Sequence, residues 1–190
     1  MAERIQQNFP LMHLRKDAVM SRFLSAISLS EPWVPGAKLP YTADLELASH
    51  AWLELKQRMK VAGTMQAKFK SVGAKPISWL NDALEVVNRP EFNPTGKGLR
   101  SIYFILLDFS DSSNGPWGVY VGSTIKSPQV RFEEHVTGVR ASKFVKRRGV
   151  QLLNTLGERF NGIKYKTTGH FEYGLAQALK AKGILVRGGH

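Results

Sequence analysis

Residues 101–108 read SIYFILLD and residues 118–124 read GVYVGST, and these two stretches decide the fold of the C-terminal half of the chain. Each is a short apolar run that holds one tyrosine, Tyr103 or Tyr120. The segment between the runs, SDSSNGPWG at 110–118, is rich in residues that favour turns. The pattern predicts a hairpin whose first strand is apolar throughout and therefore covered on both faces.

A helix is expected directly after this hairpin. Ser127 followed by Pro128 is a favourable N-cap and first-turn pair. Gly138 suits the position just beyond a helix that ends near Thr137, because glycine adopts the left-handed conformation common there. The hairpin is therefore predicted to lead into a helix of about three turns.

The rest of this half alternates between helix and strand patterns. ASKFVKRRG at 141–149 predicts a helix or turn, and VQLLNTL at 150–156 a short strand. HFEYGLAQALKAKG at 170–183 is a strong helix by composition, closed by its last glycine, and residues 184–190 form a strand or tail. The C-terminal half is thus predicted to be a small mixed domain.

The N-terminal half is predicted to be mostly helical. Apolar residues recur at helical spacing over 11–29, 42–61 and 78–88, and proline-rich connectors separate these segments. We therefore expect an α+β chain. A helical region over residues 1–98 precedes a small domain with a short central β-sheet flanked by helices over residues 99–190.

The charge of the chain predicts a polyanionic partner. There are 27 Lys and Arg against 15 Asp and Glu, a formal net charge of +12, and such a surface attracts nucleic acid. Residues 99–190 hold 14 of the basic and 6 of the acidic residues, so most of the excess lies in the C-terminal half. The competing interpretation is an unrelated enzyme whose charge serves solubility.

The composition also excludes several classes of protein. The absence of cysteine excludes disulfide scaffolds, thiolate zinc sites and cysteine nucleophiles, and fits a reducing compartment. The longest apolar run, around 102–107, is too short to cross a bilayer, and residues 1–16 lack the continuous apolar core of a secretory signal. We therefore expect a soluble, cytoplasmic protein with no membrane partner.

Arg131 and His135 lie four residues apart and share one face of the predicted helix. Such a pair can meet one phosphate, because arginine offers a planar fork to its oxygens and histidine can donate a hydrogen bond or move a proton. The competing interpretation is a solvated surface pair with Glu133 and Glu134 as ion-pair partners. The two tyrosines are equally ambiguous, because strand tyrosines often fill the edge of a core.

Glu172 is the only acidic residue between Glu158 and the C-terminus. An isolated carboxylate in a basic domain is suited to hold a divalent metal ion next to a phosphate. The competing explanation is a favourable interaction with the dipole of a helix that begins nearby.

Five positions now occur together in the order and approximate spacing of a known family. They are SIY at 101–103, YVG at 120–122, Arg131, His135 and Glu172. On these motifs the segment 99–190 resembles the GIY-YIG nuclease superfamily. The resemblance implies a DNA endonuclease that hydrolyses phosphodiester bonds with one divalent ion, Mg²⁺ or Mn²⁺.

The resemblance also implies a role for each position. Glu172 matches the carboxylate that binds the ion, and the ion orients the scissile phosphate and stabilises its developing charge. Arg131 matches the arginine that contacts this phosphate. Tyr103 or Tyr120 matches the tyrosine that helps to deprotonate the attacking water, which requires nearby positive charge to lower its pKa. His135 can assist the base or the leaving group.

Three features depart from the family pattern. Ser101 replaces the first glycine of the motif. The two tyrosines lie seventeen positions apart, which predicts an insertion around residues 114–117. The family often has an asparagine after the metal-binding glutamate, and none follows Glu172. Arg187 or His190 would have to take over its role in positioning the phosphate.

A basic tract follows the Arg131 helix and predicts a clamp on the phosphate backbone, with binding that depends strongly on salt. Its members are Arg140, Lys143, Lys146, Arg147 and Arg148. A solvated helix face is the alternative.

Two other functions stay open. One is a catalytically silent nucleic-acid-binding module that keeps the fold. The other is a structural or adaptor protein whose N-terminal helices bind a partner and whose basic half docks on RNA. In the nuclease interpretation the N-terminal helices add DNA contacts or mediate formation of a homodimer.

Overall fold

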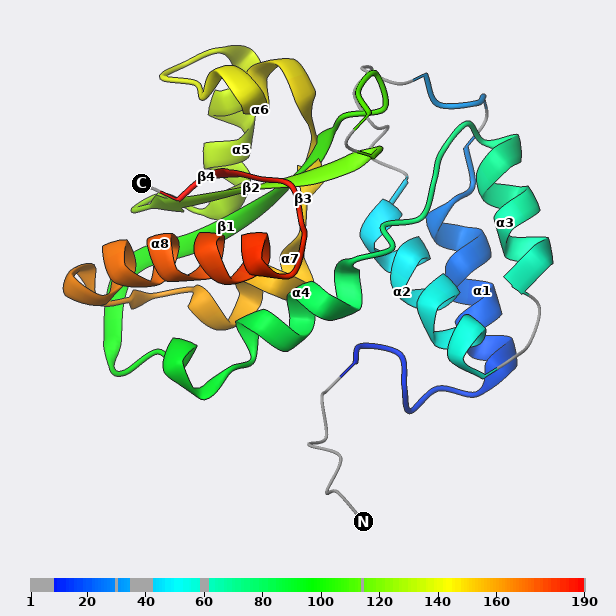
Figure 1. Ribbon diagram of the computed structural model, residues 1–190, viewed down its shortest axis with the longest axis horizontal. Helices are drawn as coiled ribbons and strands as arrows, with labels where there is room; N and C mark the ends of the chain where they lie inside the picture. Colours follow the sequence, from blue (N-terminus) through cyan, green and yellow to red (C-terminus); the bar gives the residue numbers. More distant parts are fainter. Residues whose placement is uncertain (1–8, 30, 35–42, 59–61, 114, 190) are drawn as a thin grey trace. The chain divides into compact units, whose positions relative to one another are not determined.

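The computed structural model describes residues 9–29, 31–34, 43–58, 62–113 and 115–189 (Figure 1). The chain forms two compact units, Met1–Glu85 and Val86–His190. The first is helical, and the second combines helices with a four-stranded sheet. The prediction of an α+β chain is therefore confirmed. No helix of the described residues is long and apolar enough to cross a membrane.

Four helices account for the regular structure described up to the junction of the two units. They are α1 (Lys16–Ala26), α2 (Leu45–Gln57), α3 (Ala62–Ser71) and α4 (Leu80–Val87). Asp44 caps α2 by accepting a hydrogen bond from the Leu47 N–H at 3.0 Å. Phe23 of α1 packs on Phe69 of α3 with ring centroids 5.4 Å apart. Position 42 and positions 59–61 of the predicted helix lie outside the described residues.

Residues 86–98 belong to the second unit, whereas the sequence pattern predicts a domain boundary after residue 98. Phe92, in the short 3₁₀ turn η1 (Pro90–Phe92), packs edge-on against Phe171 with centroids 5.9 Å apart. The Arg159 guanidinium also donates to the Val87 carbonyl at 2.8 Å. Aromatic packing and a long-range hydrogen bond thus bring a segment that reads as a linker into the second unit.

The second unit is built on a mixed sheet with strand order β3-β1-β2-β4. Its strands are β1 (Lys97–Asp108), β2 (Trp117–Thr124), β3 (Gly149–Leu152) and β4 (Val186–Gly188). β1 pairs antiparallel with β2 and with β3, whereas β2 pairs parallel with β4. The apolar run 102–107 lies in β1 and is fully buried, as the sequence predicts for a strand covered on both faces.

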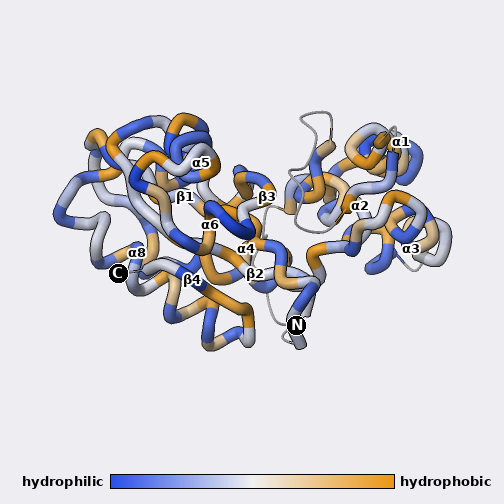
Figure 2. The backbone as a smooth tube through the Cα atoms, turned by 90° about the horizontal axis from the view of Figure 1, so that it is seen from above, coloured by the Kyte–Doolittle hydropathy of each residue, from blue (hydrophilic) through white to orange (hydrophobic). Residues whose placement is uncertain are grey.

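Helices cover both faces of this sheet (Figure 1). They are α5 (Pro128–Thr137), α6 (Lys143–Arg148), α7 (Asn154–Gly157) and α8 (Tyr165–Ala181), with a second 3₁₀ turn, η2 (Glu158–Phe160). On the face of α5 and α6, Tyr103 and Ile105 pack with Val145. On the other face, Phe104 packs on Phe160, which in turn contacts Phe171 of α8. Hydrophobic and hydrophilic residues alternate along α8, as expected for a helix with one buried side (Figure 2).

The hairpin of β1 and β2 is longer than its sequence suggests. Asp108 pairs with Trp117, so the connection spans only residues 109–116. Trp117, which we expected to belong to an inserted loop, is a buried strand residue, and Asn114 lies outside the described residues. The wide separation of the two tyrosines thus reflects extended strand pairing, because backbone hydrogen bonds and burial of an indole outweigh a turn-rich composition.

Gly122 is a point where the hairpin tolerates no side chain. A Cβ atom there would lie 2.7 Å from the Tyr103 hydroxyl and 2.7 Å from a ring carbon of Tyr120. We expect Gly122→Ala to lower the free energy of unfolding by about 1–3 kcal/mol, as other overpacked sites do. The melting temperature of the full chain, followed by circular dichroism, measures this loss.

Gly169→Ala is the matched control, because a Cβ at this position of α8 meets nothing within 4 Å. Alanine should there leave the melting temperature unchanged or raise it slightly. Equal melting temperatures for Gly122→Ala and the unchanged protein would contradict the proposed steric constraint.

Candidate functional site

Tyr103 and Tyr120 lie on the same face of the hairpin. Tyr103 is opposite Gly122, and Tyr120 is opposite Ile105, so the two rings are diagonal neighbours with centroids 6.1 Å apart. His135 of α5 lies against both rings, with its centroid 6.0 Å from that of Tyr103 and 5.6 Å from that of Tyr120. Strand register and helix position therefore bring three of the predicted site residues together.

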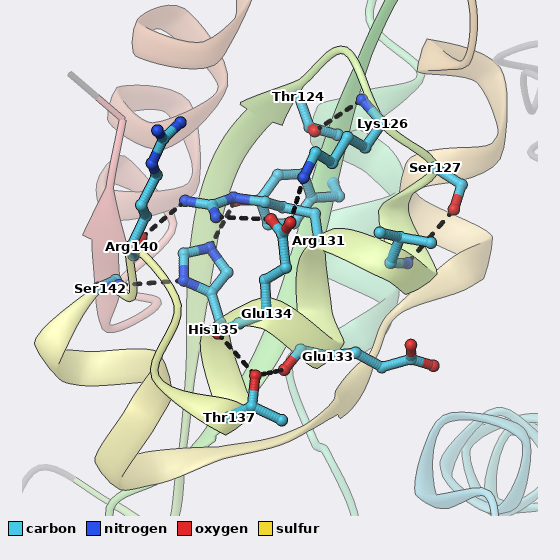
Figure 3. A network of polar contacts seen from close by, with 12 residues as sticks. Thr124, Lys126, Ser127, Arg131, Glu133, Glu134, His135, Thr137, Arg140 and Ser142 are labelled. Atoms are coloured by element: carbon cyan, nitrogen blue, oxygen red, sulfur yellow. Dashed lines mark hydrogen bonds and ion pairs between the residues drawn. The ribbon is translucent and has the colours of Figure 1, made fainter.

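His135 is buried, and both of its ring nitrogens are engaged within the protein. The Ser142 backbone N–H donates to Nδ1 at 3.0 Å (Figure 3). Nε2 lies 2.8 Å from the Tyr103 hydroxyl. Because Nδ1 accepts, the neutral ring carries its proton on Nε2 and donates it to the Tyr103 oxygen. Burial, and then the charge of Arg131, lower the pKa of His135 to about 4. His135 is therefore neutral at pH 7 and holds a tyrosine hydroxyl, and has no free nitrogen for a phosphate.

The environment keeps both tyrosines protonated. Burial raises the pKa of Tyr103 far above its usual range, and the charge of Tyr120 adds to this effect, whereas Arg131 opposes it. Burial also raises the pKa of Tyr120, followed by the charge of Glu172. Tyr103 is only 2% exposed, but Tyr120 is half-buried and lines a pocket. Of the two, Tyr120 is the one that can reach a bound molecule.

Arg131 is held in place at both ends of its guanidinium (Figure 3). Its Nη1 donates to Glu134 at 3.0 Å, and its Nη2 donates to the Arg140 carbonyl at 3.0 Å. Glu134 also forms an ion pair with Lys126. Of the two expected acidic partners, Glu134 pairs with Arg131, whereas Glu133 accepts a hydrogen bond from the neighbouring Gln129 at 2.9 Å. Arg131 is therefore pre-oriented, with 21% of its side chain still exposed.

A pocket of about 550 Å³ opens beside these residues. Its lining includes Tyr120, Arg131, His135, Arg140, Ser142, Phe144, Lys180 and Arg187. Four of these side chains are basic, and none of the described residues that line the pocket is acidic. Such a lining favours an anionic ligand, and its arginines suit phosphate oxygens.

Glu172 lies in the middle of α8. The helix begins at Tyr165, earlier than the pattern at 170–183 predicts, because Thr168 is buried and its hydroxyl donates to the Lys164 carbonyl at 2.9 Å. Glu172 is therefore in the third turn, where a helix dipole gives a carboxylate little stabilisation. The prediction that Glu172 interacts favourably with the helix dipole is therefore wrong, and the dipole does not explain why a glutamate occupies this position.

Glu172 acts on the tyrosines through its charge, which raises the pKa of both Tyr103 and Tyr120. It lines a second pocket of about 360 Å³ together with Arg100, Ser123 and other residues of α8. Four of the five predicted residues thus share one polar cluster, whereas Glu172 borders a separate pocket.

The residues around Glu172 can be tested for their fit to a metal ion. Within the described part of the chain, no group of three His, Cys, Asp or Glu side chains could enclose an ion. Mg²⁺ does not require such a cage, because it keeps several water ligands and often binds one or two carboxylates together with substrate phosphates. A single carboxylate such as that of Glu172 is compatible with this mode of binding, in which water and a phosphate supply the other ligands.

The basic tract divides into two kinds of residue. Arg140, Lys143, Lys146 and Arg147 are exposed to solvent. Arg148 is half-buried, and its guanidinium donates to both carboxylate oxygens of Asp111, at 2.6 and 2.9 Å. Arg148 therefore has a structural role in which its charge is neutralised, whereas among the described residues no carboxylate forms an ion pair with the other four.

Two members of the site carry no clear signal in the sequence. Ser142 contributes a backbone N–H, so its side chain gives no indication of the contact. Arg187 lies opposite Tyr120 across the parallel pairing of β2 with β4, and a three-residue strand at the end of a chain is hard to predict. The sequence named Arg187 only as a substitute for a missing asparagine, and His190 lies outside the described residues.

Comparison with known proteins found no matching family model, no matching curated protein and no matching solved structure.

The buried state of His135 predicts a pH dependence of stability. Its pKa is about 4 in the folded chain and 6.5 for an ordinary histidine, so the unfolded chain binds more protons between these values. Stability from this residue is full above pH 6.5 and is lost as the pH falls towards 4. We expect a loss on the order of 2 kcal/mol, measured by denaturant unfolding at several pH values.

His135→Gln removes this titration and should flatten the pH dependence. His50 of α2, whose pKa is also about 4, remains in both proteins and accounts for the residual slope. Parallel curves for the variant and the unchanged protein would show that His135 does not titrate as described.

Proposed function

We propose that the Val86–His190 unit is a GIY-YIG-type endonuclease that hydrolyses DNA phosphodiester bonds with one divalent ion. The observation that carries this proposal is the clustering of Tyr103, Tyr120, Arg131 and His135 beside a basic pocket, under the influence of the Glu172 charge. These residues match the family motifs in identity and order. The hairpin followed by a capped helix is also compatible with a GIY-YIG-like fold.

In this proposal Glu172 would hold Mg²⁺ or Mn²⁺ against the scissile phosphate. When bound, the ion supplies positive charge that stabilises the phosphate and the leaving oxygen in the transition state. Arg131, fixed by Glu134 and the Arg140 carbonyl, presents its exposed edge to the same phosphate. Its pre-orientation limits the entropy lost when the phosphate binds.

Tyr120 is the proposed base, because it reaches the pocket while Tyr103 does not. As a phenolate, Tyr120 accepts the proton of the attacking water while the new P–O bond forms and the ester P–O bond breaks. The leaving oxygen then takes a proton from solvent. Burial and the charge of Glu172 raise the pKa of Tyr120, whereas its neighbours Tyr103, Arg131 and Ser142 oppose this rise. The positive charge of a bound ion would favour the phenolate further.

His135 has a positioning role in this scheme. It donates to the Tyr103 oxygen, which leaves the Tyr103 proton available for another acceptor on the side of Tyr120, whose ring centroid lies 6.1 Å away. The neutral state of His135 keeps this chain of donors in one direction at pH 7. A charge on the ring would require both nitrogens to donate, and the contact with the Ser142 N–H would be lost.

A catalytically silent DNA-binding module is the second candidate. Two observations favour it: the pKa values of both tyrosines are raised, and no asparagine follows Glu172. In that case the same basic pocket and exposed lysines bind DNA without cleaving it.

Incubation of plasmid DNA with the purified full chain and Mg²⁺ or Mn²⁺ tests the proposal. We expect nicking that EDTA abolishes, and a loss of at least about a hundredfold in rate for Glu172→Gln and for Arg131→Gln. Tyr120→Phe should lose activity similarly while it keeps DNA binding, because only the hydroxyl is removed.

Glu133→Gln is the matched control for these variants, since this exposed carboxylate of α5 contacts only its own helix among the described residues. It should cleave at the normal rate. DNA binding without cleavage in either metal would select the silent module, and full activity of Glu172→Gln would exclude the proposed metal ligand.

Salt dependence distinguishes the two kinds of basic residue. Each phosphate contact contributes a slope of about −0.9 to the plot of log K against log salt concentration. Lys146→Gln should reduce the magnitude of this slope by about that amount for duplex DNA, measured by fluorescence anisotropy. Arg148→Gln should leave the slope unchanged and lower the melting temperature, because its charge is already paired with Asp111. If Arg148→Gln reduced the slope and Lys146→Gln did not, Arg148 would be the residue that contacts a phosphate and Lys146 would not.

A further inference from the structure

The C-terminal edge of the basic pocket contains an arginine in an unusual environment. β4 runs parallel to β2, and this pairing sets Arg187 opposite Tyr120. Both residues line the pocket that also holds Arg131. A ligand phosphate bound between Tyr120 and Arg131 would therefore have Arg187 on its flank.

The Arg187 guanidinium is stacked on aromatic rings and is not neutralised. It lies 5.0 Å from the centroid of Phe144 and 5.7 Å from that of Phe109. Its Nη1 donates weakly to the Val186 carbonyl at 3.2 Å, and its Nε is buried without a hydrogen-bond partner. Among the described residues no carboxylate forms an ion pair with it.

Arg148 packs on the same Phe109 ring as Arg187 but has a purely structural role. Its guanidinium lies 4.6 Å from the ring centroid. Its donors, however, are used by Asp111 and by the Asp108 carbonyl. Two arginines thus pack on one ring, and only Arg187 keeps donors for a ligand. A partly buried arginine without an acidic partner is costly unless an anion completes its hydrogen bonds.

Phe144 adds an aromatic surface to the same pocket. It is the second residue of α6, and 43% of it is exposed, although a large apolar side chain gains by burial. Lys143 precedes it, and Arg187 covers part of its ring. An exposed ring among cations is the arrangement with which proteins stack on bases of single-stranded nucleic acid, while basic groups bind the backbone.

We propose that this pocket binds an unpaired nucleotide of a DNA strand, with Arg187 on its phosphate and Phe144 stacked on its base. The inference rests on the proposed function, because it names the form of DNA that the same site prefers. A base inside a duplex is stacked on its neighbours and cannot cover the Phe144 ring. The site therefore favours DNA with an unpaired segment over fully paired DNA.

The test compares two fluorescein-labelled probes in EDTA, so that binding is measured without cleavage. One is a short single-stranded oligothymidine, and the other is a blunt duplex of random sequence. For the unchanged chain, the affinity for each probe by anisotropy defines a ratio of single-strand to duplex affinity. We expect Phe144→Leu and Arg187→Gln each to lower this ratio by about tenfold, the usual size of one stacking or charged contact.

Two further variants separate this effect from loss of charge or of fold. Lys143 lies next to Phe144 but does not line the pocket. Lys143→Gln removes one positive charge, so it should weaken the binding of both probes equally and leave the ratio unchanged. Arg187→Lys keeps the charge but lacks the planar fork, and it should lower the ratio by less than Arg187→Gln. Melting curves check that each variant is folded.

The outcomes distinguish this inference from the proposed function. An unchanged ratio in folded Phe144→Leu and Arg187→Gln proteins overturns the inference, even if plasmid cleavage depends on Glu172. A reduced ratio in a protein that never cleaves DNA supports the inference and removes the endonuclease assignment.

Discussion

The antiparallel pairing of β1 with β2 is the constraint on which the second unit depends. In this register Tyr103 faces Gly122, and Tyr120 lies diagonally on the same side, so that the Tyr103 hydroxyl meets His135 and the Tyr120 ring packs against the imidazole. The absence of a side chain at Gly122 leaves the space that the Tyr103 hydroxyl occupies. A shift by one residue would turn one tyrosine to the opposite face of the sheet and separate the pair.

The electrostatic balance of the site follows from this packing. Burial raises the pKa values of Tyr103 and Tyr120 and lowers that of His135. Burial alone would therefore leave two protonated tyrosines and a neutral histidine. Arg131 counters that effect on both tyrosines, and Glu172 reinforces it. A cation beside Glu172 would cancel the effect of its charge, which is why the metal-dependent proposal and the raised pKa values are compatible.

Local features were the most accurately predicted from sequence. Ser127 caps α5 by accepting from the Val130 N–H, and Gly138 adopts a φ of 97° after its last turn, as both residue types suggest. The start of α8 and the extent of β2 were predicted less accurately. Thr168 and Trp117 gain more from burial than their local preferences indicate. Tertiary packing outweighs propensity wherever a side chain enters the core.

The sequence by itself determined the division into a helical and a mixed half, the position of the basic excess and the set of candidate residues for chemistry. The strand predicted over 150–156 is wrong beyond Leu152, because residues 154–157 form the helix α7. Only the tertiary structure decided which of the candidate residues reach a ligand. It buries Tyr103 and His135, leaves Tyr120 at a pocket, and pairs Arg148 with Asp111 thirty-seven positions away. It also places Arg187 beside Phe144 without a carboxylate partner among the described residues. Exposure and charge pairing depend on partners distant in the chain, which local patterns of sequence do not specify.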